Sequence, residues 1–461
     1  MTGVQTCALP ILLKQLREGF LHRDKPEDVT PTRDTHVRNN LLLHLHPNRV
    51  PAKALRFSYT WGLGGISIVL LVLLGLTGLL LMFRYDPRVE YAYVSIQQLE
   101  TEVMFGSFIR AVHTWSANLL VIAAFLHLVR VFLTGSYKQG RSVNWIIGLV
   151  LFVMVLVANF TGYLLPWDQL AYWAITVSTS LMAYIPLFGT AVRNFFLGGP
   201  QVGQAALSNF YALHVVFIPT LILGFLGYHL WKVRKNGGIS QPELKEGESP
   251  EFKATNPHLV NIELAVGMVV LVVVGLWAMF KPAPLGAIAN PMNPPNPAKA
   301  AWYFLGLQEL LLHMHPLAVM ALLAVAVVAL AITPYVDRDA RDIGIYFRSA
   351  IGKRAAIIGS LIALYLVPMA VILDEFWYDL PGWLPGLSSD LTIGVIPFMI
   401  TLSVFVGLYF LIRSGWLFKN EKPNHSETLV GIFAFMMSAL ILLTIVGIYF
   451  RGQNMALILP F

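Results

Sequence analysis

Four histidines lie in apolar stretches of the sequence at nearly equal intervals. His113 and His127 are 14 positions apart in "RAVHTWSANLLVIAAFLHLVR", and His214 and His229 are 15 apart in a second apolar stretch. A helix turns by about 100° and rises by about 1.5 Å per residue, so either interval returns to nearly the same face about 21 Å further along. Ionisable side chains are costly in hydrocarbon, which points to a function. Two facing pairs of imidazoles, at two levels, are what two bis-histidine haems require.

The histidine interval recurs in glycines of two neighbouring apolar stretches. Glycine lets a neighbouring group approach the backbone closely, as a flat macrocycle between helices would need. A lone intramembrane histidine is more often a hydrogen-bonded contact between helices, but the repeated interval favours haem sites. The expected pairs are His113 with His214 and His127 with His229. The glycines, in two pairs 14 apart, are Gly64 with Gly78 and Gly148 with Gly162.

The elements that must position these residues are membrane-spanning helices. The 461 residues are 56% hydrophobic and only 12% charged, which excludes an ordinary soluble domain. Runs of about 20 apolar residues predict an all-α, polytopic membrane protein with about nine transmembrane helices, of which the first four form a four-helix dihaem bundle. The predicted helices are 62–83, 108–134, 143–165, 208–231, 260–280, 317–335, 355–373, 391–412 and 428–450.

The positive charge follows the predicted topology. With a cytoplasmic N-terminus, 24 of the 32 Lys and Arg fall on the cytoplasmic side and 6 on the other, while Arg110 and Arg130 lie at the ends of one helix. This bias orients the chain and explains the net charge of +7 without a nucleic-acid partner. The single cysteine, Cys7, allows neither an internal disulfide nor a cysteine-ligated cluster.

Linkers and long loops divide the chain into five parts. The long connections 166–207 and 281–316 lie on the same, non-cytoplasmic face and are rich in aromatic residues, as loops that build a site often are. We expect a cytoplasmic segment 1–61 with one amphipathic helix along the membrane (1–11 being a poor signal peptide and possibly non-native), the dihaem bundle 62–235, a cytoplasmic linker 236–258, a domain 259–335 with a quinol-site loop, and additional transmembrane helices 336–461.

Three motifs give the chain a resemblance to a known family. They are "RVFLTGSYK" (130–138), "GYLLPWDQLAYWA" (162–174) and "AWYFLGLQELL" (301–311). With the paired histidines, they resemble the cytochrome b subunit of bacterial quinol-oxidising cytochrome bc complexes over about 55–335. The 15-residue histidine interval and "RVFLTGSYK" are more similar to the plastid and Gram-positive type, although nine helices here form one chain.

This resemblance implies a quinol:cytochrome c oxidoreductase subunit. Quinol would be oxidised near the outer face, with one electron passing to a Rieske iron-sulfur protein and on to a c-type cytochrome or plastocyanin-like acceptor. The other electron would cross the membrane through two b-type haems and reduce quinone near the cytoplasmic side. The overall reaction would be coupled to proton translocation. The resemblance also implies a homodimeric complex in a bacterial cytoplasmic membrane.

Residues of the 281–316 loop are the expected quinol site. Trp302 and Tyr303 match the end of the family's Pro-Glu-Trp-Tyr motif, whose glutamate accepts a proton; here Ala300 and Ala301 replace the first two residues. Glu309 is the nearest substitute, since burial should raise its pKa toward a useful value. A structural carboxylate near a helix N-terminus is the equally weighted alternative. Further candidates for the lining are Tyr163, Trp167 and Tyr172, whereas His313 and His315 are expected at the surface or in hydrogen bonds.

Two arginines next to the histidines are expected to meet haem propionates. Arg110 precedes His113 by three residues, matching the family's arginine there, and Arg130 follows His127 by three. The alternative for each is snorkelling to the membrane surface. At two positions the chain departs from the pattern: Thr114 stands where a basic residue is frequent, and Gly62 stands where the plastid type attaches a further haem to cysteine. No covalent third haem is therefore expected.

Two other functions fit parts of the pattern. A b-type haem anchor of a quinone-linked dehydrogenase would have the histidines but not the 301–311 motif. A transporter should show ionisable pairs or broken helices at mid-membrane, which the sequence lacks. Helices after 336 are expected to be scaffold or partner contacts. Arg234 and Lys235 either line the inner quinone site or are topological charges.

Overall fold

The computed structural model describes residues 46–242, 249, 251–339, 342–419 and 421–458. The expected amphipathic helix and residues 1–11 fall largely outside this part of the chain. Nine helices among the described residues are long and apolar enough to span a membrane, as predicted. No water is available in hydrocarbon to pair with the backbone. An apolar run of this length therefore folds as a helix, in which the backbone hydrogen bonds are made within the run.

Most spanning helices extend the predicted ranges by a few residues at one end or both, while α5 and α8 are one residue or two shorter than predicted. Most gain polar or capping residues at their ends; α19, for example, begins with a capping box between Asn424 and Glu427. The nine are α5 (Leu63–Met82), α7 (Gly106–Leu133), α8 (Ser142–Tyr163), the continuous segment of α11 (Gln204–Ala212), η2 (Leu213–Phe217) and α12 (Ile218–Lys235), α13 (Thr255–Phe280), α15 (Pro316–Val336), α16 (Ala350–Phe376), η4 (Asp390–Val395) with α18 (Ile396–Ser414), and α19 (His425–Tyr449).

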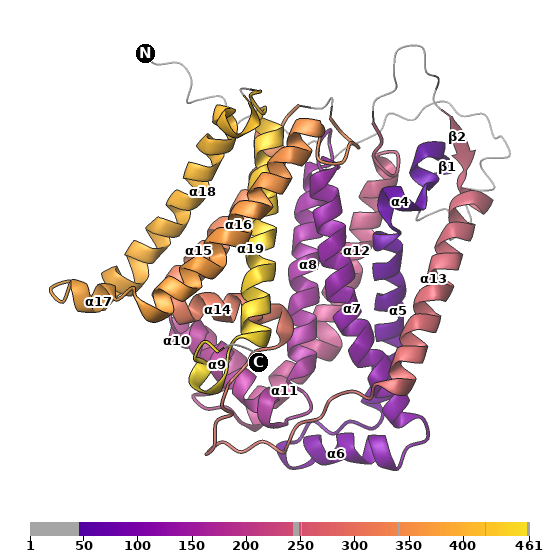
Figure 1. Cartoon of the computed structure of the whole chain (residues 1–461). Helices are drawn as coiled ribbons and strands as arrows, with labels where there is room; N and C mark the ends of the chain where they lie inside the picture. Colours follow the sequence, from indigo (N-terminus) through magenta and orange to yellow (C-terminus); the bar gives the residue numbers. More distant parts are fainter. Residues whose placement is uncertain (1–45, 243–248, 250, 340–341, 420, 459–461) are drawn as a thin grey trace.

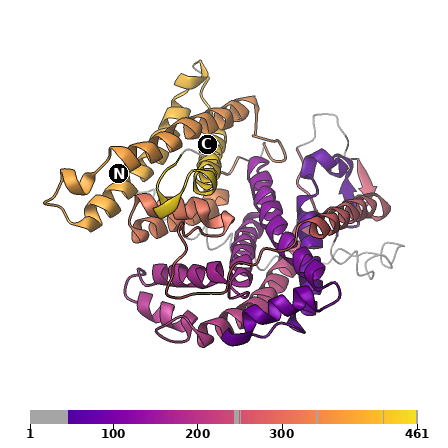
Figure 2. The same ribbon diagram turned by 60° about the horizontal axis from the view of Figure 1, so that its bottom comes forward.

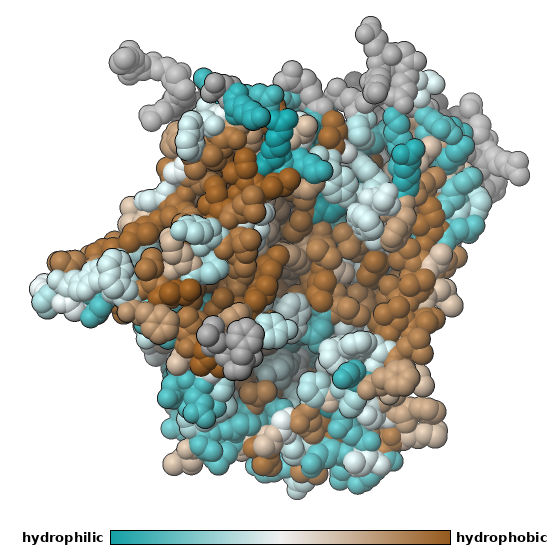
Figure 3. Space-filling view, in the orientation of Figure 1, coloured by the Kyte–Doolittle hydropathy of each residue, from teal (hydrophilic) through white to brown (hydrophobic). Residues whose placement is uncertain are grey.

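The spanning helices form two adjoining groups, drawn side by side in Figure 1. In one, α5, α7, α8 and α12 pack as a bundle, with α13 against α5 and α7. In the other, α16 packs along α19, and α15 and α18 contact each other. A cluster of buried side chains that includes Phe132 on α7 and Phe433 on α19, stacked 3.8 Å apart, joins the groups. Figure 3 shows an apolar band across the face in view, with polar residues gathered toward both ends.

Short elements cover the two ends of the bundle. At one end, β1 (Arg49–Pro51) pairs antiparallel with β2 (Phe252–Ala254), so the N-terminal segment is fastened to the linker before α13; η1 (Ala52–Leu55) and α4 (Phe57–Thr60) follow β1. The opposite end, turned forward in Figure 2, carries the long connections. Their helices are α6 (Val89–Thr101), α9 (Gln169–Met182), α10 (Gly189–Leu197), η3 (Trp302–Phe304), α14 (Leu305–His313) and α17 (Leu380–Trp383); the short turns η5 (Trp416–Phe418) and η6 (Gln453–Met455) flank α19.

Candidate functional site

The bundle brings the four histidines together in two pairs. The rings of His113 and His214 have their centroids 6.3 Å apart, with planes at 77°. A metal–imidazole bond is about 2 Å long and a ring nitrogen lies about 1 Å from the centroid, so two rings sharing one metal would be roughly 6 Å apart. The second pair, His127 and His229, lines a common cavity. The arrangement is the one predicted for two bis-imidazole sites.

A π-helical turn explains why the interval is 15 in one helix and 14 in the other. The turn η2, Leu213–Phe217, contains His214 and directly precedes α12, which has Pro219 in its first turn. Such a turn accommodates one extra residue without ending the helix, and proline provides the cause because it donates no backbone hydrogen bond. The π-helical turn takes up the extra residue. His229 therefore lines the same cavity as His127, and His214 pairs with His113 at the other level.

Each of the four glycines faces one histidine. A Cβ on Gly78 would lie 3.3 Å from Cε1 of His113, and one on Gly162 only 2.5 Å from Cε1 of His214. For Gly64 and His127, and for Gly148 and His229, the corresponding distance is 3.6 Å. The glycines were expected to make room for a macrocycle; in the structure they make room for the imidazole rings. The glycines recur at nearly the same interval as the histidines because each glycine makes room for the ring of one histidine.

The cavity at the inner pair has a volume of about 350 Å³. It lies between α5, α7, α8, α12, α13 and the segment before α5. It extends to His46, whose Nε2 lies 3.1 Å from Oε1 of Glu263 on α13. This pair was not predicted from the sequence, although a carboxylate such as Glu263 within an apolar run indicates a functional or paired group. Lys235, considered for this region, stacks its ammonium over Trp231 at 5.9 Å.

Arg130 presents an unsatisfied donor at this cavity. The side chain is 8% exposed and lines the cavity beside His127. Its Nε donates to the carbonyl of Tyr59 (3.4 Å) and its Nη1 to Ser136 (3.3 Å), but its buried Nη2 has no hydrogen-bond partner among the described residues. A buried cationic donor without a partner is unfavourable, and an anionic group in the cavity would satisfy it. The side chain therefore does not extend to the membrane surface, which was the alternative expected for Arg130.

Known proteins resemble the part of the chain that carries the histidine pairs. Residues 50–237 match the family model described as cytochrome b/b6/petB. Cytochrome b6 of Heliobacterium modesticaldum is 41% identical over 197 residues, which cover 43% of this chain and 90% of the relative. The menaquinol:cytochrome c reductase cytochrome b subunit of Geobacillus thermodenitrificans is 36% identical over 221 residues, 48% of this chain and 96% of the relative. The chain belongs to the cytochrome b family.

A solved structure shares the cytochrome b fold over most of the chain. A chain of a hyperthermophilic respiratory complex III aligns with a TM-score of 0.61 at 21% identity, covering 90% of this chain and 97% of that one. The chain is therefore a cytochrome b subunit of the bc type and an integral membrane protein. Membership implies b-type haem, and the paired imidazoles, the facing glycines and the free Nη2 of Arg130 fit that group.

Arg110 has partners of its own in the structure. It is buried, forms an ion pair with Glu100 on α6, and donates to the carbonyls of Ala283 (3.1 Å) and Pro284 (2.6 Å). These contacts tie α7 to the connection that follows α13. The propionate contact expected of Arg110 stays a prediction, whereas its anchoring of the 281–316 loop is visible.

The predicted quinol-site aromatics do not all gather in one place. Trp302 donates to Asn118 on α7 (2.6 Å), and Tyr303 packs between Trp302 and Phe304 beside the bundle core. The Tyr303 hydroxyl is buried without a hydrogen-bond partner, and burial with nearby Tyr163 raises its pKa. The other two, Trp167 and Tyr172, pack against each other in a cluster near α9 and α11 that also includes Tyr163.

The expectation that Glu309 has a raised pKa is wrong. Glu309 is 0% exposed, and Arg451 contacts it three times, at 2.6, 3.0 and 3.1 Å. Burial alone would raise the pKa of Glu309, but hydrogen bonds from His313 and Arg451 and their charges lower it. The sequence could not show this because Arg451 lies beyond the last spanning helix. The contacts give Glu309 a structural role through Arg451 and His313, and not the expected role in a first helical turn, because Glu309 lies in the middle of α14.

His313 makes hydrogen bonds, as predicted, and links the ion pair to α16. Its Nδ1 lies 2.6 Å from Oδ2 of Asp374 and its Nε2 3.2 Å from Oε1 of Glu309. The neighbouring Glu375 receives a hydrogen bond from Arg451 at 2.7 Å. Burial would lower the pKa of His313, but Asp374 and Glu309 raise it to about 9. His315 instead accepts from the backbone of Leu317 at the start of α15.

Stability is expected to fall above neutral pH through His313. Its pKa is raised from 6.5 to about 9, so its contribution is full below about pH 6.5 and disappears as pH rises through 9. At 1.36 kcal/mol per pKa unit the upper limit is about 3 kcal/mol. Thermal unfolding in detergent between pH 6 and 10 should show a drop that His313→Gln lacks. An identical pH dependence in both proteins would contradict this assignment.

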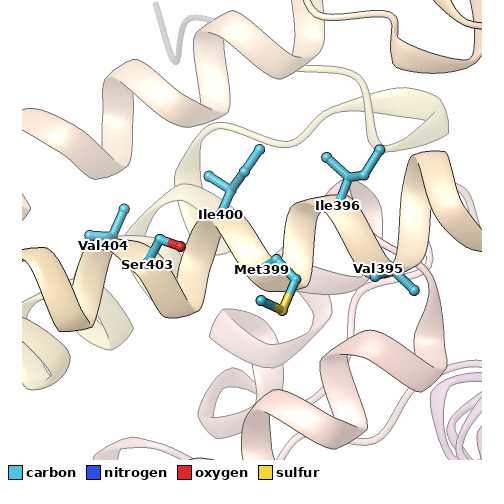
Figure 4. Close-up of a pocket in the computed structure, with 6 residues that line it drawn as sticks. All are labelled: Val395, Ile396, Met399, Ile400, Ser403 and Val404. Atoms are coloured by element: carbon cyan, nitrogen blue, oxygen red, sulfur yellow. The ribbon is translucent and has the colours of Figure 1, made fainter.

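A second hollow lies on α18 and carries no redox chemistry. Figure 4 shows the six side chains that line it, all from η4 and α18: Val395, Ile396, Met399, Ile400, Ser403 and Val404. Its only polar side chain is a serine, and it belongs to the apolar outer surface of the spanning helices. Such a surface suits lipid tails.

Proposed function

We propose that this cytochrome b holds two haems and oxidises quinol near the outer face of a bacterial cytoplasmic membrane. The observation that carries the proposal is the set of two histidine pairs, each with a glycine facing every ring. His113 and His214 would ligate the outer haem, His127 and His229 the inner one. When bound, haem supplies one-electron redox chemistry, and the two levels lie about 21 Å apart along the helices.

Quinol oxidation releases two electrons and two protons. One electron goes to a Rieske protein and then a c-type cytochrome; the other moves inward past the levels of the two histidine pairs to reduce quinone near the N-terminal, cytoplasmic side. The Geobacillus relative, named as a menaquinol:cytochrome c reductase cytochrome b subunit, supports a quinol as donor and a cytochrome c as acceptor. The inner cavity supports the reduction of quinone, because the His46–Glu263 pair could supply protons there. The complex would translocate protons and work as a homodimer.

Trp302 and Tyr303 form the proposed quinol side of the site. The buried hydroxyl of Tyr303 has no partner among the described residues, so a quinol oxygen could pair with it. Trp302 is held by its hydrogen bond to Asn118 on the helix that carries His113. Glu309 is not needed for binding, because its two oxygens already have partners.

A redox-titrated optical spectrum of the purified complex tests the proposal. Two separate b-type transitions are expected from this chain. A spectrum without haem, or with one transition, would refute the dihaem function. The alternative, a haem anchor of a dehydrogenase, would show b-type haem but no transfer of electrons from quinol to cytochrome c, which an assay of the same complex decides.

Arg130→Gln is expected to weaken binding of the inner haem alone. The substitution removes the charge and the unpaired Nη2 donor of a side chain that lines the cavity, and a charge-assisted hydrogen bond contributes about 1.5–3 kcal/mol. The apparent affinity for the inner haem should therefore fall by about 10- to 150-fold, measured as haem retained per protein after dilution in detergent. Arg193→Gln, on α10, is the control. Equal retention in both variants would show that Arg130 does not meet the haem.

A further inference from the structure

We infer that Thr77 and Thr161 are positioning residues that hold the outer pair of imidazoles in one tautomer and lower the redox potential of the haem between them. Each threonine directly precedes the glycine that faces a histidine of the outer pair. The inference rests on the proposed dihaem function. It explains why electrons would move from the outer to the inner haem, because it gives the outer haem the lower redox potential.

The hydrogen bonds of Thr77 fix its role as an acceptor. Its hydroxyl donates to the carbonyl of Leu73 at 2.6 Å, one turn earlier on α5, and Oγ1 lies 2.9 Å from Nδ1 of His113. A hydroxyl has one hydrogen, so with that hydrogen engaged it receives the proton of Nδ1. The Nε2 lone pair of His113 is then left for a metal.

Thr161 holds His214 in the same way on α8. Its hydroxyl donates to the carbonyl of Val157 at 2.9 Å, and Oγ1 lies 3.2 Å from Nδ1 of His214. The same Nδ1 also lies 3.0 Å from the carbonyl oxygen of Ala158, which can only accept. Nδ1 of His214 is therefore the donor, independently of how the hydroxyl is oriented.

Among the described residues, the inner pair receives no such hydrogen bond from a threonine. The residues before Gly64 and Gly148 are Leu63 and Ile147, which carry no hydroxyl. The backbone of Asn144 approaches His229, but Nδ1 of His229 makes no hydrogen bond of ordinary geometry among the described residues. The same helices thus treat the two levels differently: hydroxyl acceptors at the outer pair, aliphatic side chains at the inner pair.

The difference in hydrogen bonding between the two pairs should give the two haems different redox potentials. A hydrogen bond from Nδ1–H makes an imidazole a stronger electron donor through Nε2 and so favours the oxidised metal. Axial-ligand hydrogen bonding is one of the ways in which a protein sets a haem potential. The outer pair, with three acceptors on two Nδ1 atoms, should hold the lower potential, and an electron moves downhill from the outer to the inner level.

Valine variants test the inference in the purified, haem-loaded complex. Thr77→Val and Thr161→Val remove the two hydroxyl acceptors and keep the shape, which leaves only the carbonyl of Ala158 on His214, so the outer transition should shift to higher potential while the inner one stays. Thr77→Ser and Thr161→Ser should restore the wild-type value. Thr333→Val is the matched control, because that hydroxyl also donates to the carbonyl four residues earlier, Ala329 at 2.8 Å, and makes no hydrogen bond to a histidine among the described residues.

The outcomes separate this inference from the proposed function. If the wild type lacks two b-type transitions, the dihaem proposal fails. If it has two and the valine variants leave both unshifted, or shift both equally, only the role of the threonines is overturned. If the valine variants lose the outer haem, Thr77→Cys and Thr161→Cys, with a weak acceptor in place of the hydroxyl, provide the same comparison.

Discussion

His127→Ala is expected to abolish the inner haem and leave the outer one, and His113→Ala to do the reverse. Each substitution removes one of the two proposed haem ligands of a pair, while the partner histidine and its glycine remain. Loss of a residue that only supports a metal ligand already weakens metal binding by about 10–100-fold, so loss of the ligand itself should empty the site. Optical difference spectra and haem-to-protein ratios of the purified complex measure the result.

The control for the histidine variants is His258→Ala. This histidine lies exposed in the first turn of α13 and bonds only the backbone of Ala254. It should keep both haems and full electron transfer from quinol to cytochrome c. Retention of both transitions in His113→Ala and His127→Ala would show that these pairs do not bind haem.

Glu309→Gln is expected to destabilise the protein strongly and to reduce turnover per folded complex only slightly. The substitution leaves Arg451, itself 3% exposed, beside a neutral amide, and breaking a buried pair in this way costs about 3–5 kcal/mol. As the pKa of Glu309 is lowered, its loss should not remove the main proton acceptor for quinol. Thermal unfolding and haem-normalised quinol oxidation are the two measurements.

A double variant separates the ion pair from a catalytic role. Glu309→Gln with Arg451→Gln removes both charges, so its stability should be higher than the sum of the single losses predicts. Arg354→Gln, which breaks the exposed pair with Glu421, should change stability by less than about 1 kcal/mol. A large fall in haem-normalised turnover for Glu309→Gln, unrelieved in the double variant, would restore Glu309 as the proton acceptor.

Much of the fold and the histidine site could be predicted because both depend on local periodicity. Apolar runs of membrane length determine a spanning helix, since the backbone can satisfy its hydrogen bonds within the run. The regular rise and turn of a helix convert the interval between His113 and His127 into two levels on one face. The same rule relates Gly64 to Gly78. None of these inferences requires knowledge of what lies beside the helix.

The tertiary structure decided what depends on neighbours far away in the sequence. Glu309 and Arg451 are 142 residues apart, so only the packing of α14 against α19 shows that the carboxylate is paired and its pKa lowered. The contact of Thr77 with His113 likewise needs α5 and α7 side by side. Sequence by itself determined the helices, the histidine levels and the glycine intervals, because these are properties of single helices. The partners of each polar group were decided by the fold, because hydrogen bonds and ion pairs depend on distances between helices.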